Sequence, residues 1–180
     1  MNVFTTTPCV PCVNRTEALR YAGVREASVE IEALLDSCIA ETENSFSYKV
    51  CYAEVEKDSL PKDLSSLSFL ENCKKTIIFA ATVGLEIDRL IKKYSVISPS
   101  RALMLQALGA ERIEALCDAF CQGFPNAAQR YSPGYGNFTL ENQSYIFSLL
   151  NPSRHIGLTL NTSLLMSPSK SVTAIFGLKE

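Results

Sequence analysis

The stretch TIIFAATVG, residues 76–84, is a continuous run of apolar and β-branched residues that ends in a glycine. A run of this length without polar alternation is typical of a strand that is buried on both faces. A helical pattern follows, and a strand, a glycine and a helix in succession can hold a phosphate group. With one glycine and neither a GxGxxG nor a GKT sequence, a tight turn at Gly84 is the favoured interpretation.

Two helical patterns follow this strand. Residues 85–94 repeat apolar side chains at helical spacing, and the longest helical stretch runs from Ser100 to Phe120. Glu111, Glu114 and Asp118 line one side of the longer helix, and an acidic row of this kind is usually a solvated face. The apolar stripe of the same helix consists of Ile113, Leu116, Cys117 and Phe120.

The residues before the strand predict two helices and a further strand. Residues 14–23 predict a short helix, and residues 31–39 place apolar side chains at i, i+3, i+4, i+7 and i+8, which is one helical face. Residues 46–55 then alternate between apolar and smaller or polar side chains. This alternation is typical of a half-buried strand.

After the long helix, residues 139–151 predict another helix, and residues 155–163 and 170–178 predict two closing strands with a loop between them. Strands thus lie at both ends of a helix-rich middle, without regular alternation of strand and helix. The pattern favours an α+β fold, in which helices pack on a twisted, mainly antiparallel or mixed sheet. We expect a single domain over residues 1–180, with an N-terminal helical part (1–44) and an α+β core (45–180).

The composition argues against several classes of protein. The chain has 180 residues, 47% of them hydrophobic and 20% charged, which is ordinary for a globular protein. Its formal net charge of −2 argues against a nucleic-acid-binding surface. The chain has no apolar run of about 18 residues, so we expect no membrane span. The N-terminus, MNVFTTTPCVPC, lacks the features of a signal peptide, and we therefore expect a cytoplasmic protein.

Seven cysteines in a chain without an export signal indicate free thiols. Cys9 and Cys12 form a CxxC pair, whose candidate zinc partners are Cys117 and Cys121, but buried or idle thiols are the favoured interpretation and we predict no metal site. The single histidine, His155, directly precedes a predicted strand and is more typical of a structural or exposed residue than of a catalytic base. The sequence contains no HExxH, Walker or GxSxG motif, so we predict no catalytic side chain.

The stretch RYSPGYG, residues 130–136, combines groups that suit a ligand. Arg130 can hold a carboxylate with two parallel hydrogen bonds. Pro133 and Gly134 fit a type II turn, which lets backbone approach a ligand closely. Tyr131 and Tyr135 each offer an apolar face and a hydrogen-bonding hydroxyl. Together these residues would suit an amphiphilic small molecule with a carboxylate, and an ordinary loop is the alternative.

RxSPGYG is the first of several ordered motifs, followed by LExQ, IGLTL and MxPxKSVTAI before residue 178. In this order they resemble the C-terminal activation domain of cobalamin-dependent methionine synthase, and more closely the stand-alone family of that domain. EALRYAG (17–23), FAATVG and IDRLI (79–91), and RALMLQALGAERIE (101–114) are also similar to that family. The resemblance covers nearly the whole chain and implies the fold of the methionine synthase activation domain.

The resemblance also implies a function and a site. In the family, the domain presents S-adenosylmethionine to an oxidised cobalamin carried by a partner protein, and an electron, often from a flavodoxin, allows the methyl group to be captured. Arg130 would bind the S-adenosylmethionine carboxylate, Tyr135 would face the corrinoid, and Glu114 on the preceding helix would contact the ligand. The methyl acceptor is the cofactor, so the protein needs no acid or base. The implied site residues are Arg130, Ser132, Pro133, Gly134, Tyr135 and Glu114.

Two other functions stay open. The chain could be a non-catalytic partner that caps or senses the cobalamin of a corrinoid protein without using S-adenosylmethionine. It could also be a metal or redox module built on Cys9 and Cys12. The favoured function makes the chain a component of a methyltransferase system for reactivating methionine synthase, rather than a self-contained enzyme.

Overall fold

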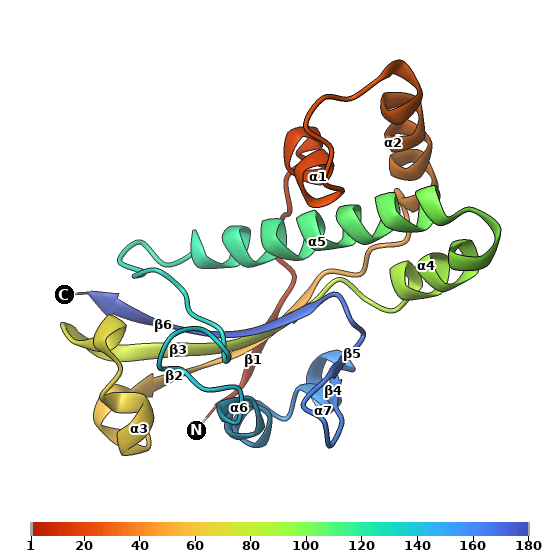
Figure 1. The fold of residues 1–180 in the computed structure, drawn as a ribbon. Helices are drawn as coiled ribbons and strands as arrows, with labels where there is room; N and C mark the ends of the chain where they lie inside the picture. The colour runs from red at the N-terminus through yellow and green to blue at the C-terminus, as the bar shows by residue number, and fades with distance from the viewer. Residues whose placement is uncertain (1, 180) are drawn as a thin grey trace.

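A four-stranded antiparallel sheet with strand order β1-β2-β3-β6 forms the centre of the molecule (Figure 1). The computed structural model describes residues 2–179, so Met1 and Glu180, the two ends of the expected domain, lie outside the described residues. Helices cover both faces of the sheet, which confirms the predicted α+β class. The strands of the sheet are β1 (Phe4–Thr6), β2 (Lys49–Glu56), β3 (Cys73–Thr82) and β6 (Ser171–Lys179).

The central strand β3 contains most of the apolar run at residues 76–84. It pairs with β2 on one side and with β6 on the other. Ile77 and Phe79 belong to the core on one face of the sheet, whereas Ile78 and Ala80 belong to the core on the other, and all four are fully buried. The predicted burial on both faces is therefore confirmed. Gly84 follows at φ +92°, a conformation that favours glycine, and the chain then enters helix α4 (Glu86–Ile97).

The first face of the sheet is covered by α5 (Pro99–Cys121), which is 23 residues long. Helix α4 lies beside α5, and α1 (Arg15–Tyr21) and α2 (Val29–Thr42) pack on its outer side (Figure 1). Because α5 lies between the sheet and these helices, most of its apolar side chains are buried. None of the helices within residues 2–179 combines the length and the apolar character needed to cross a membrane.

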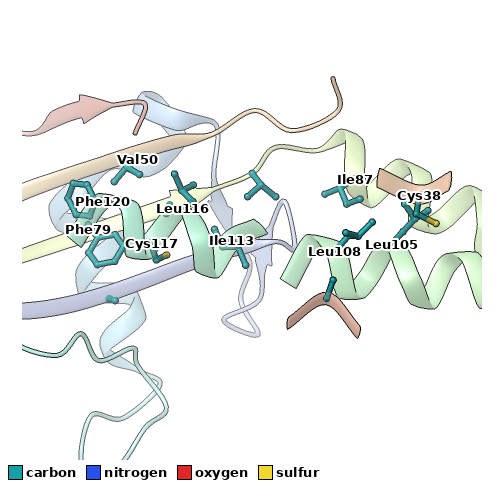
Figure 2. Packing of buried hydrophobic residues seen from close by; sticks show 14 of the residues in the cluster. Cys38, Val50, Phe79, Ile87, Leu105, Leu108, Ile113, Leu116, Cys117 and Phe120 are labelled. Carbon is teal, nitrogen blue, oxygen red and sulfur yellow. The ribbon is translucent and has the colours of Figure 1, made fainter. Parts of the chain in front are cut away.

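The core beneath α5 extends from the sheet to the helices (Figure 2). At the sheet end, the rings of Phe79 and Phe120 lie 4.9 Å apart between their centroids. At the helical end, Leu105 and Leu108 of α5 pack with Ile87 of α4. The predicted apolar stripe of α5 thus faces the core.

The second face of the sheet is covered by shorter elements. The strand predicted at residues 155–163 is present only at Thr159–Leu160. Pro152 begins a helix that contains His155 and ends at Ile156, and Gly157 follows at φ +74°. His155 is exposed on this helix rather than placed before a strand. The elements after β2 on this side are η1 (Lys57–Ser59), α3 (Lys62–Ser65), η2 (Ser68–Leu70), α6 (Asn142–Leu150), α7 (Pro152–Ile156), β4 (Thr159–Leu160) and β5 (Met166–Ser167).

Two further expectations differ from the structure. Strand β2 is not half-buried, because Cys51 and Ala53 face the second core and are as buried as Val50, which faces the first. The first 44 residues, expected to be helical, also contribute β1, which pairs with β2 at the edge of the sheet. In both cases a segment that is distant in the sequence packs on the strand or pairs with it.

Candidate functional site

The segment after α5 runs along the free edge of β6 and positions Arg130. Tyr131 N–H donates to Ile175 O at 2.8 Å, and Ile175 N–H donates to Tyr131 O at the same distance. Successive side chains of an extended chain point to opposite sides. Tyr131 therefore stacks on Phe69, on the second face, with 4.1 Å between the ring centroids, whereas Arg130 reaches toward α5 on the first face.

Arg130 forms ion pairs with two carboxylates of α5. Its Nη2 donates to Glu114 Oε2 at 2.6 Å, and its Nη1 donates to Asp118 Oδ1. Glu114 and Asp118 are four residues apart, so they lie on the same face of the helix. Burial alone would lower the pKa of Arg130, but the hydrogen bond to Asp118 and the nearby negative charges outweigh it, and the pKa is raised. The guanidinium therefore carries its charge at every accessible pH.

The predicted type II turn is present at residues 132–135. Tyr135 N–H donates to Ser132 O at 3.3 Å, and Gly134 has φ +97° at the third position of the turn. Gly134 N–H donates to Phe138 O at 2.7 Å, so this amide is used within the loop. A Cβ on Gly134 would have only Leu140 Cδ1 nearby, at 3.8 Å. The turn thus needs glycine for its backbone conformation rather than for space.

A cavity of about 510 Å³ lies between α5, the loop and β6. Its volume is within the range of about 300–1,000 Å³ that is usual for small-molecule sites. Four of the six predicted site residues line it: Glu114, Arg130, Ser132 and Tyr135. The other two, Pro133 and Gly134, form the adjoining turn, and Pro133 is buried. Tyr135 is 70% exposed, so it presents a phenol ring at the surface beside the cavity.

The sequence pattern does not identify two residues of the site. The acidic row on the long helix predicts a solvated Asp118, although the i+4 spacing of Asp118 from Glu114 is that of a second partner for the same cation. Cys121, one helical turn further, lines the cavity. Burial raises the pKa of the Cys121 thiol, and the neighbouring Arg130 opposes this shift.

A second cavity, of about 490 Å³, shares Glu114 with the first and is lined by Cys9, Cys12 and Asp118 among others. Cys9 and Cys12 are exposed free thiols, whereas Cys117 is buried in the core (Figure 2). Cys117 therefore does not lie in this cavity with the CxxC pair. Among residues 2–179, no three histidine, cysteine, aspartate or glutamate side chains are grouped in a way that could hold a metal ion.

The expectation that Glu111 lies on a solvated face is wrong. Its side chain is 5% exposed and forms an ion pair with Arg112, whose Nε donates to Glu111 Oε2 at 2.5 Å. Arg112 also donates to Pro11 O at 2.5 Å and Cys12 O at 3.1 Å, and Asn14 N–H donates to Glu111 Oε1 at 3.1 Å. The N-terminal segment thus crosses α5 and buries this part of the helix.

No family model matches the chain, and no curated protein matches it in sequence. Among solved structures, the crystal structure of the MetH reactivation domain bound to AdoHcy matches with a TM-score of 0.68 and 15% sequence identity. The match covers 99% of this chain and 78% of that chain. At this identity the comparison shows a shared fold, and it confirms the fold implied by the resemblance.

Proposed function

We propose that this chain is a reactivation subunit for cobalamin-dependent methionine synthase, in which the Arg130 cavity binds S-adenosylmethionine. The observation that carries the proposal is the pairing of Arg130 with Glu114 in a cavity beside the RYSPGYG turn. The same fold is found in a reactivation domain that was crystallised with AdoHcy, the demethylated form of this ligand. The ordered motifs, which resemble those of the activation domain family, support the same function.

The charges of the cavity fit the amino-acid end of the ligand. The guanidinium of Arg130 has the donor geometry that binds a carboxylate through two hydrogen bonds. Glu114 lines the same cavity and can accept hydrogen bonds from the ligand's ammonium group. A zwitterion therefore finds one partner of opposite charge for each of its own charges. Ser132, which also lines the cavity, offers a hydroxyl group.

The loop would form the surface that meets the partner protein. Tyr135 is 70% exposed and Leu140 is 43% exposed, which leaves apolar area next to the cavity. An aromatic face is suited to packing on a planar corrin ring. In this arrangement S-adenosylmethionine supplies the methyl group, which the partner's cobalamin accepts once one electron is delivered. The chain would hold the donor in line with the acceptor, so its contribution is positioning.

The proposal is tested with a cobalamin-dependent methionine synthase that lacks its own activation domain. The oxidised synthase is incubated with S-adenosylmethionine, a flavodoxin-type reductant and this chain, and the return of activity is followed. We expect activity to return with the wild-type chain and with Arg15→Ala, and to be lost with Arg130→Ala. Arg15 is a matched control, because it is an arginine that pairs with two acidic residues, Glu32 and Asp36, away from the cavity. No return of activity with the wild-type chain and the correct partner would contradict the proposal.

The hydrogen bonds that Arg130 already makes within the chain support a second candidate function. Both terminal nitrogens of Arg130 already donate to carboxylates, and Gly134 N–H is used within the loop. An arginine that the chain's own carboxylates already hold would suit a protein that caps cobalamin without using S-adenosylmethionine. Binding of the chain to a corrinoid protein that neither depends on S-adenosylmethionine nor changes with Arg130→Ala would favour this second function.

A further inference from the structure

One cation and two anions meet at Arg130, so the network carries an excess negative charge before any ligand binds. Glu114 and Asp118 each accept a hydrogen bond from a different terminal nitrogen of the guanidinium. A ligand carboxylate would compete with both for the N–H groups of the same guanidinium. A carboxylate that binds a guanidinium through two parallel hydrogen bonds needs two of these N–H groups side by side, so we expect one of the two protein carboxylates to leave Arg130 when the ligand binds.

We infer that Asp118 is the internal competitor for the ligand: it occupies Arg130 in the free protein and is displaced by the ligand's carboxylate. This inference rests on the proposed function, because it concerns the same site and the same ligand. It adds a residue that regulates affinity and that is not a ligand-binding group itself.

The exposure of the two carboxylates identifies which one leaves. The Asp118 side chain is 59% exposed, compared with 44% for Glu114. An exposed ion pair is worth little and its carboxylate is readily rehydrated. Glu114 also lines the ligand cavity, where it can take up the ligand's ammonium group, whereas Asp118 lines the neighbouring cavity and not this one. Release of Asp118 toward that second cavity thus leaves Glu114 in place for the ligand.

The contact with Asp118 has a function in the free protein. Arg130 extends from a loop, and its side chain is only 22% exposed. Two carboxylates on one helical face hold its guanidinium over the cavity in the absence of ligand. The same contact weakens ligand binding, because the ligand must compete for Nη1. Removing the charge of Asp118 while keeping Glu114 should therefore strengthen binding.

The inference is tested by calorimetric titration of S-adenosylhomocysteine into wild-type protein, Asp118→Asn and Asp118→Ala. We expect both variants to bind about two- to five-fold more tightly, the gain that corresponds to removing an exposed competing ion pair. Asp36→Asn is the matched control, because Asp36 is 62% exposed and pairs with Arg15, and its change alters the net charge by the same amount. We expect the control to bind with wild-type affinity. Damage to the fold cannot produce tighter binding.

The outcomes separate the inference from the proposed function. Wild-type binding with equal or weaker binding by both Asp118 variants would overturn the inference and leave the proposed function standing. An equal gain in Asp36→Asn would assign the effect to net charge and would also overturn the inference. If neither wild type nor variants bind S-adenosylhomocysteine, the proposed S-adenosylmethionine site fails and the inference fails with it.

Discussion

Arg112 on α5 and Arg130 in the loop after it each form an ion pair with a glutamate of α5, and the two arginines differ in what surrounds them. Arg112 is 4% exposed, and its guanidinium donates to Glu111 and to the carbonyls of Pro11 and Cys12. Arg130 is 22% exposed, and both of its partners, Glu114 and Asp118, are in contact with solvent. The first arginine fixes a chain segment, whereas the second lines a cavity.

The difference shows which arginine can exchange its partners. The partners of Arg112 are a buried carboxylate and two backbone carbonyls, none of which can leave without exposing an unpaired buried group. The partners of Arg130 can turn into water at little cost, because exposed ion pairs contribute little to stability. An arginine with replaceable partners beside a cavity is suited to binding a ligand, and one with irreplaceable partners is suited to holding the fold.

The largest effect is expected from Arg112→Met. This change leaves the Glu111 carboxylate buried without its counter-charge and should lower the free energy of unfolding by about 3–5 kcal/mol. Urea unfolding followed by circular dichroism measures this value. Arg130→Met is the matched control and should cost about 1 kcal/mol or less. Similar losses for the two variants would remove the distinction between the two arginines.

Glu114→Gln should have the next largest effect, on binding rather than on stability. The neutral amide keeps the shape of the side chain but loses the charge that faces the ligand's ammonium, and a hydrogen bond to a charged group is worth about 1.5–3 kcal/mol. S-adenosylhomocysteine should therefore bind about tenfold more weakly or worse in a calorimetric titration. Glu17→Gln, in the second cavity, should leave the affinity unchanged. Unchanged affinity in Glu114→Gln would show that Glu114 does not contact the ligand.

A smaller effect is expected from Gly134→Ala, which acts on the loop that carries Arg130. Because Gly134 has φ +97° and open space around it, the cost comes from backbone strain, about 1–2 kcal/mol. Thermal unfolding measures it, with Asn137→Ala, an exposed neighbour in the same loop, as the control that should change stability by less than about 0.5 kcal/mol. Equal stability of Gly134→Ala and wild type would show that the turn does not need glycine.

The smallest effect is expected on the rate of cysteine labelling, which compares a thiol that lines the cavity with a thiol in the core. Iodoacetamide should react with Cys9 and Cys12 first, slowly with half-buried Cys121, and not with Cys117. Because burial raises the pKa of Cys121, its labelling should continue to accelerate as the pH rises above the ordinary thiol pKa of about 8.5. Mass spectrometry of the labelled peptides should show that S-adenosylhomocysteine slows the labelling of Cys121 alone. Labelling of Cys121 that does not respond to the ligand would place the ligand elsewhere.

Local sequence patterns predicted those elements whose burial follows from the residues of the element itself. The run at residues 76–84 has no polar alternation, and its burial on both faces follows from that. The helical spacing in α5 likewise predicts its apolar stripe. The burial of Glu111 could not be predicted this way, because its cover comes from residues about 100 positions earlier in the chain. The burial of β2 on both faces likewise depends on packing by distant segments. The short helix that contains His155 depends on local turns.

In the candidate site, too, local features could be predicted from the sequence and contacts between distant segments could not. The RYSPGYG stretch predicts a type II turn, which the structure has, and an arginine that holds the carboxylate of a ligand, which stays a prediction. The sequence did not indicate that the first carboxylates to reach Arg130 would be those of the protein itself. Their approach depends on the pairing of Tyr131 with β6, which sets the distance between the loop and α5.

The central claim is that Arg130 binds the carboxylate of an S-adenosyl ligand, and a calorimetric titration of S-adenosylhomocysteine tests it most directly. The titration compares wild type, Arg130→Ala and Arg15→Ala, alone and with the cobalamin-binding partner present. We predict saturable binding with one site per chain for wild type and Arg15→Ala, and no measurable binding for Arg130→Ala at the same concentrations. Equal binding by wild type and Arg130→Ala, or no binding by wild type even with the partner, would contradict the claim.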